Sequence, residues 1–183
     1  MSAGVILYGA PANGKDTITG ALTQLDPTFQ LFRRIKCGPG RTVGYRMTTA
    51  SEFERLSEAG ELIWMNERYA ARYGIDRPGL NSQFAARQIP VVHAGQPEVI
   101  WAVMKATPEV CWSVVELRCS RDVARARIIA RETGDTAARL QAWDSTPLLR
   151  AADLTIRTDT VSPEEAAQSI RALVLGSNRT PTD

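Results

Sequence analysis

Short apolar runs alternate along this chain with longer segments in which apolar residues recur at helical spacing. Residues 5–8 form an unbroken apolar run, as expected for a strand that is buried on both faces of a sheet. Residues 15–25 place Ile18, Leu22 and Leu25 on one side of a helix. Because this alternation continues to about residue 175, it predicts an α/β fold with a mostly parallel sheet that helices cover on both faces.

The bounds of the later elements follow from capping residues and turn formers. Ser120 is a candidate helix cap, and residues 51–54 and 162–165 both have the S-x-x-E spacing of a capping box. We expect a loop at residues 37–44, which hold three glycines and a proline. Helices are expected at about residues 51–60, 120–132, 136–143 and 162–175, with another ending at 84–88. Further strands are expected at residues 31–35, 89–93, 110–119 and 154–157.

Composition narrows the class of protein. A chain of 183 residues suffices for one domain with a sizeable core, and no apolar run has the length of a membrane span. The three cysteines lack C-x-x-C spacing, which favours free thiols in a reducing, cytoplasmic setting. A single histidine excludes a multi-histidine metal site, and a net charge of +2 gives no support for nucleic-acid binding. We therefore expect neither a nucleic acid nor a membrane as partner.

The strongest chemical signal is a glycine-rich loop between the first predicted strand and the first predicted helix. Residues 9–17 read G-x-x-x-x-G-K-D-T, the spacing of a P-loop whose backbone N–H groups surround phosphate oxygens. The positive end of the following helix and the charge of Lys15 add to the attraction. The pattern favours a nucleotide site, with ATP as the expected ligand, over an ordinary turn. The residues expected to contact the nucleotide are Gly9, Ala12, Asn13, Gly14, Lys15, Asp16 and Thr17.

Asp16 departs from the usual P-loop, in which Ser or Thr follows the lysine. A carboxylate is favourable at a helix N-terminus, but beside ATP it would repel phosphate unless a Mg²⁺ ion lay between them. We therefore expect Asp16 to belong to a Mg²⁺ site, with the hydroxyl of Thr17 as the alternative ligand. A simple helix-capping role for Asp16 is the competing interpretation.

A second group of positive charges surrounds the loop at residues 37–44. Guanidinium and ammonium groups would hold the phosphate of an acceptor molecule through charge-assisted hydrogen bonds. Tyr45 and Tyr73 are further candidates to hydrogen-bond an acceptor, although half-buried structural tyrosines are equally common. The competing interpretation of the charged group is a solvated loop. Its members are Arg33, Arg34, Lys36, Arg41 and Arg46.

The middle of the chain resembles guanylate kinases. Residues 44–53, Gly-Tyr-Arg-Met-Thr-Thr-Ala-Ser-Glu-Phe, are similar to the family segment in which a tyrosine precedes a capped helix, and residues 61–74 resemble the acceptor-binding lobe. Arg127, Arg131 and Arg139 resemble the arginine-rich lid. The resemblance implies a three-layer P-loop kinase fold in one domain at residues 1–175, with a lobe at about 37–80, a lid at about 121–147 and a disordered tail at 176–183.

Several positions depart from the guanylate kinase pattern. Trp64 stands where that family has a guanine-reading glutamate, Ile75 replaces a serine, and a second base-reading acid falls near Ala94. Without these polar partners the physical basis for guanine selectivity is missing. Ribose 1,5-bisphosphate phosphokinases of phosphonate utilisation carry G-K-D-[ST] and Tyr-Gly-Ile, and this chain is similar to them at residues 14–17 and 73–75.

This resemblance implies phosphoryl transfer from ATP, with Mg²⁺, to a small phosphorylated acceptor, and ribose 1,5-bisphosphate is the first candidate. Lys15, Arg131 and Arg139 would act in catalysis by offsetting the charge of the transferred group. The alternatives are a nucleoside or deoxynucleoside monophosphate kinase, since some phage enzymes share the G-K-D-T loop, and a guanylate-kinase-like binding module without catalysis. The acceptor would contact Arg34, Lys36, Arg41, Tyr45 and Tyr73.

Overall fold

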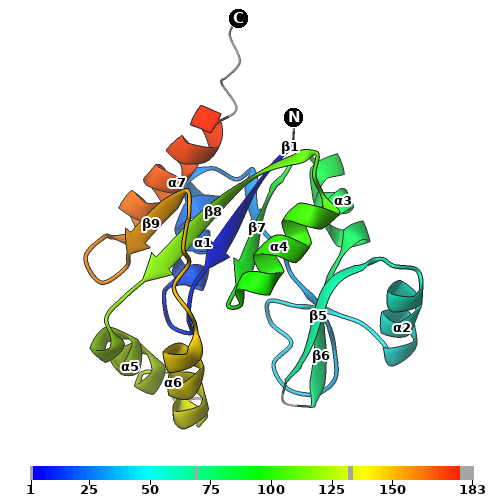
Figure 1. The fold of residues 1–183 in the computed structure, drawn as a ribbon, viewed down its shortest axis with the longest axis horizontal. Helices are drawn as coiled ribbons and strands as arrows, with labels where there is room; N and C mark the ends of the chain where they lie inside the picture. Colours follow the sequence, from blue (N-terminus) through cyan, green and yellow to red (C-terminus); the bar gives the residue numbers. More distant parts are fainter. Residues whose placement is uncertain (1, 69, 132–133, 178–183) are drawn as a thin grey trace, which may run out of the picture.

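The main sheet of the computed structural model, which describes residues 2–68, 70–131 and 134–177, has five strands that all run parallel (Figure 1). Their order is β2-β7-β1-β8-β9, so the first strand of the chain lies at the centre. Parallel neighbours present their carboxyl ends at one edge, where ligands of α/β proteins bind. The strands are β1 (Ser2–Tyr8), β2 (Phe29–Leu31), β7 (Ile89–Ala94), β8 (Val110–Arg118) and β9 (Leu154–Arg157).

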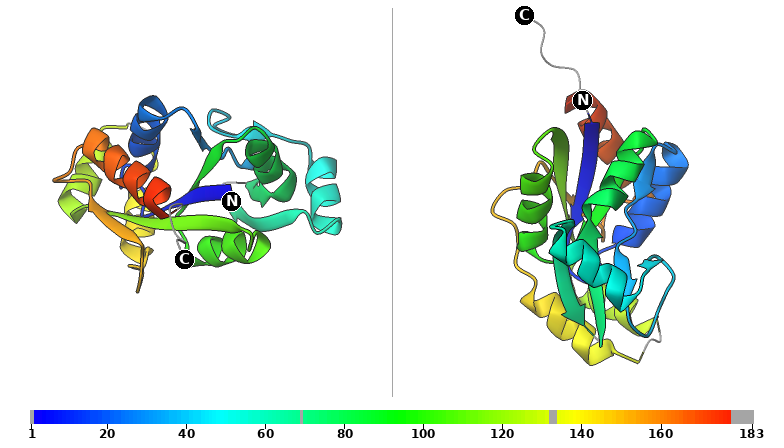
Figure 2. Two further views of the ribbon diagram at one scale, coloured as in Figure 1. Left: turned by 90° about the horizontal axis from the view of Figure 1, so that it is seen from above. Right: turned by 90° about the vertical axis from the view of Figure 1, so that its right-hand side faces the viewer.

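Helices cover both faces of this sheet, as Figure 2 shows from above. Val5 and Leu7 point into a core with α1 (Lys15–Leu25) and α7 (Pro163–Ser177). Their neighbour Ile6 points to the opposite face, where the second core includes side chains of α3 (Arg77–Ala85) and α4 (Pro97–Ala106). The unbroken apolar run of β1 therefore serves two cores, and the expected three-layer α/β architecture is confirmed.

Two smaller units flank the carboxyl edge of the main sheet (Figure 1). The lobe is a four-stranded sheet of order β4-β3-β6-β5 with one helix, α2 (Ala50–Glu58), packed on it through Phe53 and Leu56. The predicted lid is a pair of helices, α5 (Arg121–Ile129) and α6 (Thr136–Ser145). The strands of the lobe are β3 (Ile35–Cys37), β4 (Arg46–Met47), β5 (Leu62–Arg68) and β6 (Ala71–Asp76).

Several predicted helix starts are confirmed. Ser120 caps α5 by accepting a hydrogen bond from the backbone N–H of Val123. At the start of α7, Ser162 and Glu165 exchange the two reciprocal hydrogen bonds of a capping box. Local sequence was sufficient to predict these helix starts, because each cap is completed within four residues.

Two predicted element bounds were wrong. A strand at residues 31–35 does not form, because the chain leaves the main sheet after Leu31 and joins the lobe sheet at Ile35. Helix α2 begins before Ser51, since the hydroxyl of Thr49 accepts the N–H of Glu52 and acts as the cap. The sequence contains a T-x-x-E spacing two residues ahead of the S-x-x-E spacing, and the earlier one is used.

Other elements were not predicted or end elsewhere. Helix α4 and strand β6 were missed; α4 opens with Pro97, which suits the first helical position but also suits a turn. Helix α7 continues to Ser177, two residues beyond the predicted end, and residues 178–183 of the predicted tail lie outside the described residues. Among the described residues, no helix has the length and apolarity needed to cross a membrane.

Candidate active site

The P-loop leaves β1 at its carboxyl end and turns directly into α1. Gly14 has a φ angle of 90° and Ala12 one of 64°, so the chain curls through left-handed conformations before the helix begins. A Cβ at Gly9 would lie 2.7 Å from the carbonyl oxygen of Leu117 on β8. The loop therefore needs glycine at its first position for close approach and at Gly14 for its backbone angle.

The side chain of Asn13 anchors the P-loop to the body of the protein. Its side chain is buried, and its amide nitrogen donates to the carbonyl oxygen of Leu117 at 2.7 Å. Its amide oxygen accepts from the indole N–H of Trp143 at 3.0 Å and from the thiol of Cys119 at 3.2 Å. Because the side chain points into the fold, Asn13 can offer a phosphate only its backbone N–H.

Lys15 lies over the loop as a poorly solvated cation. Its Nζ donates to the carbonyl oxygens of Gly9 at 2.5 Å and Ala10 at 2.9 Å. Burial lowers the pKa of Lys15 to about 8, and the nearby charges of Arg34 and Arg131 act in the same direction. A bound anion would reverse this effect, so the loop is electrostatically prepared for phosphate.

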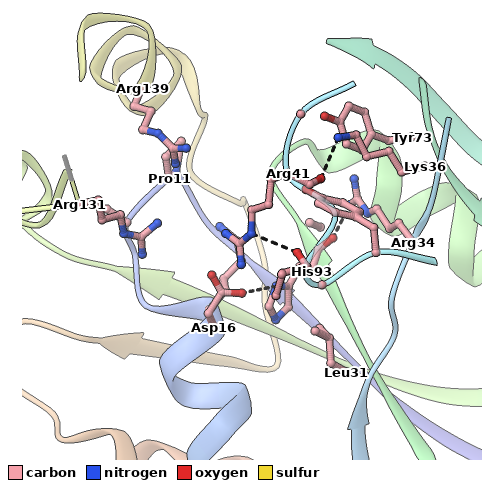
Figure 3. Close-up of a pocket in the computed structure, with 18 of the residues that line it drawn as sticks. Pro11, Asp16, Leu31, Arg34, Lys36, Arg41, Tyr73, His93, Arg131 and Arg139 are labelled. Atoms are coloured by element: carbon pink, nitrogen blue, oxygen red, sulfur yellow. Dashed lines mark hydrogen bonds and ion pairs between the residues drawn. The ribbon is translucent and has the colours of Figure 1, made fainter. Parts of the chain in front are cut away.

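A cavity of about 740 Å³ extends from the P-loop to the lobe and is closed on a third side by the predicted lid (Figure 3). Among the described residues that line it are six cationic side chains but only two carboxylates, those of Asp16 and Asp135. This excess of positive charge suits a ligand with several phosphate groups. The six cations are Lys15, Arg34, Lys36, Arg41, Arg131 and Arg139.

On the lobe side, Lys36 supports the loop at residues 37–44 from within. Its side chain is buried, and its Nζ donates to the carbonyl oxygens of Pro39 at 2.6 Å and Arg41 at 2.8 Å. The same ammonium lies 5.7 and 5.6 Å from the ring centres of Tyr45 and Tyr73. Two of the three N–H donors of Lys36 are thus used by the loop. The side chain of Arg41 extends from the loop into the cavity (Figure 3).

The remaining members of the predicted charged group separate into two environments. Arg34 lines the cavity, donates to the carbonyl oxygen of His93 and lies 4.8 Å above the ring of Trp64. Burial lowers its pKa to about 10. Arg33 and Arg46 were wrongly grouped with it: Arg33 is exposed outside the cavity, and Arg46 is paired with the buried carboxylate of Asp76.

The arginines of the predicted lid also occupy different positions. Arg131 and Arg139 both line the cavity, and Arg139 forms an ion pair with Asp135 at 2.7 Å. Arg127 instead donates to the carbonyl oxygens of Ala12 at 3.1 Å and Thr158 at 2.6 Å. It therefore ties the lid helix α5 to the P-loop, a role that the sequence pattern did not indicate.

A second cavity of about 360 Å³ adjoins the P-loop on the side of α7. Thr17 lines this cavity, whereas Asp16 lines the main one, so the two candidate metal ligands face different spaces. Of the two candidate ligands, the carboxylate of Asp16 is the one that faces the main cavity. Sequence reasoning did not identify Thr158, Val161 and Pro163, which also line this second cavity.

His93 is the second-last residue of β7. Its Nε2 is 2.8 Å from the hydroxyl oxygen of Thr19, and its Nδ1 is 3.7 Å from Oδ1 of Asp16. Burial, together with the charge of Lys15, lowers the pKa of His93 to about 3, so the ring is neutral. Within the described residues, no three His, Cys, Asp or Glu side chains gather as a metal site made of protein alone.

Comparison with solved structures places this geometry among known folds. The guanylate kinase of Anaplasma phagocytophilum superimposes with a TM-score of 0.64 at 16% identity, covering 98% of this chain and 87% of that one. The chain has the fold of P-loop kinases. A sugar kinase from a Janibacter species, solved without ligand, gives a TM-score of 0.55 at 16% identity and covers 96% and 95% of the two chains. No family model and no curated protein matches the sequence.

Within this P-loop kinase fold, all five residues predicted to contact an acceptor line one cavity with Lys15, Asp16 and both predicted catalytic arginines. Three predicted nucleotide contacts do not line this cavity: Gly9 lines a neighbouring cavity, the side chain of Asn13 is turned inward, and Thr17 faces the second cavity. Residues far apart in the sequence meet here because the P-loop, the end of β7 and the lobe all lie at the carboxyl edge of the main sheet.

Proposed function

We propose that this protein is an ATP-dependent phosphotransferase acting on a small phosphorylated acceptor, with ribose 1,5-bisphosphate as the first candidate. The observation that carries the proposal is the continuous cavity that joins an intact P-loop to a cationic lobe. One end suits the phosphates of a nucleotide, and the other suits the phosphate of a second molecule. The likeness in fold to a guanylate kinase and a sugar kinase supports the same class of reaction.

The proposed reaction needs positioning and charge neutralisation more than acid–base chemistry. An oxygen of the acceptor phosphate attacks the γ-phosphorus of ATP; the bond from that phosphorus to the β–γ bridging oxygen breaks, and ADP leaves with the bridging oxygen. The attacking oxygen is already anionic near neutral pH, so no general base is required. Lys15, Arg131 and Arg139 would offset the charge on the transferred group.

Asp16 would hold a Mg²⁺ ion on the main-cavity side, and Thr17 is the alternative ligand on the other side of the loop. Such an ion neutralises charge on the donor phosphates. The backbone N–H groups of residues 12–15 would contact the β-phosphate, which leaves Lys15 Nζ to exchange its loop carbonyls for phosphate oxygens. The second cavity, beside Thr158, would hold the adenine of the donor.

For the acceptor, Arg34 and Arg41 would bind phosphate, with Tyr45 and Tyr73 beside them and Lys36 holding the loop in place. Ribose 1,5-bisphosphate carries two phosphate groups, which matches a cavity rich in cations. Trp64, one face of which is covered by Arg34, offers no carboxylate to read a guanine base. This favours a sugar phosphate over a guanine nucleotide.

An acceptor panel tests the proposal. ATP turnover would be measured with ribose 1,5-bisphosphate and with the common nucleoside and deoxynucleoside monophosphates. We expect ribose 1,5-bisphosphate to stimulate turnover, and we expect Lys15→Met to reduce that rate at least about 100-fold. Stimulation by a nucleotide alone would identify the alternative acceptor. Binding of ATP without turnover on any acceptor would reject the kinase in favour of a non-catalytic module.

A further inference from the structure

The end of β7 and the start of α1 bring an imidazole and a carboxylate together beside the P-loop. Strand β7 lies parallel to β1 with His93 opposite Leu7, two residues before the loop begins. Both His93 and Asp16 line the main cavity, with Nδ1 of the ring 3.7 Å from Oδ1 of the carboxylate (Figure 3). The proposed reaction requires no general base, so it leaves His93 without a role.

The positions of Asp16 and His93 can be compared with those of the Mg²⁺ ligands in other P-loop proteins. There, Mg²⁺ is held by the Ser or Thr that follows the P-loop lysine and by an aspartate from another segment at the site. In this chain a carboxylate, Asp16, occupies the hydroxyl position, and His93 lies one residue before the end of β7, an apolar strand beside β1. The usual hydroxyl and carboxylate donors are therefore replaced by a carboxylate and an imidazole.

We propose that the metal ion bound with the nucleotide is coordinated by the carboxylate of Asp16 and by Nδ1 of His93. The inference rests on the proposed function, because phosphate oxygens of the nucleotide complete the coordination shell. Imidazole is a poor partner for Mg²⁺ and a good one for first-row transition metals. The site therefore favours a divalent ion such as Mn²⁺ or Co²⁺ over Mg²⁺.

The surroundings of His93 are those of a metal ligand. A coordinating histidine usually donates its second ring N–H to an oxygen acceptor, which fixes the ring. Here Nε2 is 2.8 Å from the hydroxyl oxygen of the buried Thr19, so the ring can keep its proton on Nε2 and direct the Nδ1 lone pair toward Asp16. The backbone of the same residue is held by Arg34, which donates to its carbonyl oxygen.

The geometry requires only a small adjustment. Two ligand atoms at about 2.1 Å from one ion, at a right angle, lie about 3 Å apart. The observed separation is 3.7 Å, and the side chain of Asp16 is 65% exposed, so its carboxylate is free to rotate toward the ring. Lys15 and Arg34 repel a cation at this place, and therefore we expect tight metal binding only when nucleotide phosphates are present.

Pulsed electron paramagnetic resonance on the Mn²⁺–ATP complex tests this directly. The chain contains one histidine, so an imidazole signal from protein without an affinity tag has a single source. We expect ¹⁴N modulation of the Mn²⁺ signal that changes to the ¹⁵N pattern when only histidine is ¹⁵N-labelled. If Mn²⁺–ATP binds but its spectrum is unchanged by ¹⁵N-labelling of histidine, the metal-site proposal is overturned while the proposed function is unaffected.

Variants give a second readout by calorimetric titration. His93→Asn is expected to weaken Mn²⁺ binding to the protein–ATP complex roughly tenfold or more while changing Mg²⁺ binding much less. Thr19→Val, which removes only the hydroxyl at Nε2, is expected to weaken Mn²⁺ binding about tenfold and to leave ATP binding in EDTA unchanged. Equal losses for Mn²⁺ and Mg²⁺ would contradict coordination by the ring. Absence of any ATP binding would reject the proposed function and the metal site with it.

Discussion

The ammonium nitrogen of Lys36 lies 2.8 Å from the carbonyl oxygen of Arg41, so a buried cation holds the loop from which an exposed cation reaches the cavity. The two residues have the same charge but different tasks. Lys36 is committed to the carbonyl oxygens of Pro39 and Arg41, whereas the guanidinium of Arg41 extends into the cavity. Substitutions at the two positions should therefore separate loop support from ligand binding.

Lys36→Met should cost about 1–3 kcal/mol of unfolding free energy, because two loop carbonyls lose their donor inside the lobe. It should also raise the KM for the acceptor by disordering the loop. Arg41→Gln should raise that KM with little change in stability. Urea denaturation and acceptor kinetics on both variants check this; equal stability of the two proteins would contradict a supporting role for Lys36.

Nucleotide binding should weaken as the pH rises above 8. Burial lowers the pKa of Lys15 to about 8, so the free protein loses this charge between pH 7 and 9, while bound phosphate would keep the lysine protonated. The Kd for ATP should then be about tenfold higher at pH 9 than at pH 7. Calorimetry in buffers of different ionisation enthalpy should detect proton uptake on binding at pH 9.

Rising pH should have the opposite effect on the stability of the ligand-free protein from its effect on nucleotide binding. The pKa of Lys15 is lower in the folded protein than its ordinary value of 10.5, so between pH 8 and 10.5 the unfolded chain holds more of this proton. This residue therefore makes the ligand-free fold more stable as the pH rises through that window. Lys15→Arg is the matched control, since its guanidinium keeps its charge and both pH effects should disappear. Their persistence would assign them to another group.

Two glycine-to-alanine substitutions should act in opposite directions. A Cβ on Gly4, in the central strand β1, would lie 2.3 Å from the ring of Trp112, which is fixed by a hydrogen bond to Thr107. Gly4→Ala should cost about 1–3 kcal/mol of stability. Gly20 lies in α1 with open space around it, and Gly20→Ala should add up to about 1 kcal/mol. Denaturant midpoints that shift in the same direction would contradict this assignment.

Asp76 should be important for the attachment of the lobe. Its buried carboxylate pairs with Arg46 and also caps α3 by accepting the N–H of Gly79 at 2.9 Å. Asp76→Ala should cost about 2–4 kcal/mol, since it removes a helix cap and leaves a guanidinium without its partner. Asp144→Ala, which breaks the exposed pair with Arg121, should destabilise the fold much less than Asp76→Ala. Chemical denaturation of the two variants makes the comparison.

Local sequence patterns were sufficient for the P-loop and its surroundings. The loop, helix α1 and the caps at Ser120 and Ser162 depend on residues that are neighbours in sequence. The meeting of Arg34, Arg41 and Arg131 around Lys15 was expected from the resemblance to guanylate kinases and from the way parallel strands end at one edge.

The features that sequence did not reveal depend on distant pairs. Arg46 was placed among the ligand-binding cations because its partner, Asp76, lies 30 positions away. The metal-binding role proposed for His93 depends on β7 lying next to β1 and on Thr19 and Asp16 meeting the ring from α1. A lone histidine has no periodicity or spacing from which such neighbours follow.

The contacts of the Asn13 side chain restrict which substitutions this position can accept during evolution. It occupies one of the variable positions of the G-x-x-x-x-G-K pattern, yet its amide contacts Leu117, Cys119 and Trp143, the last of them 130 positions away. A change at Asn13 alone would leave the indole N–H of Trp143 unsatisfied beneath the loop. Among relatives of this protein, residues 13 and 143 should therefore be exchanged together, as a correlated pair in an alignment.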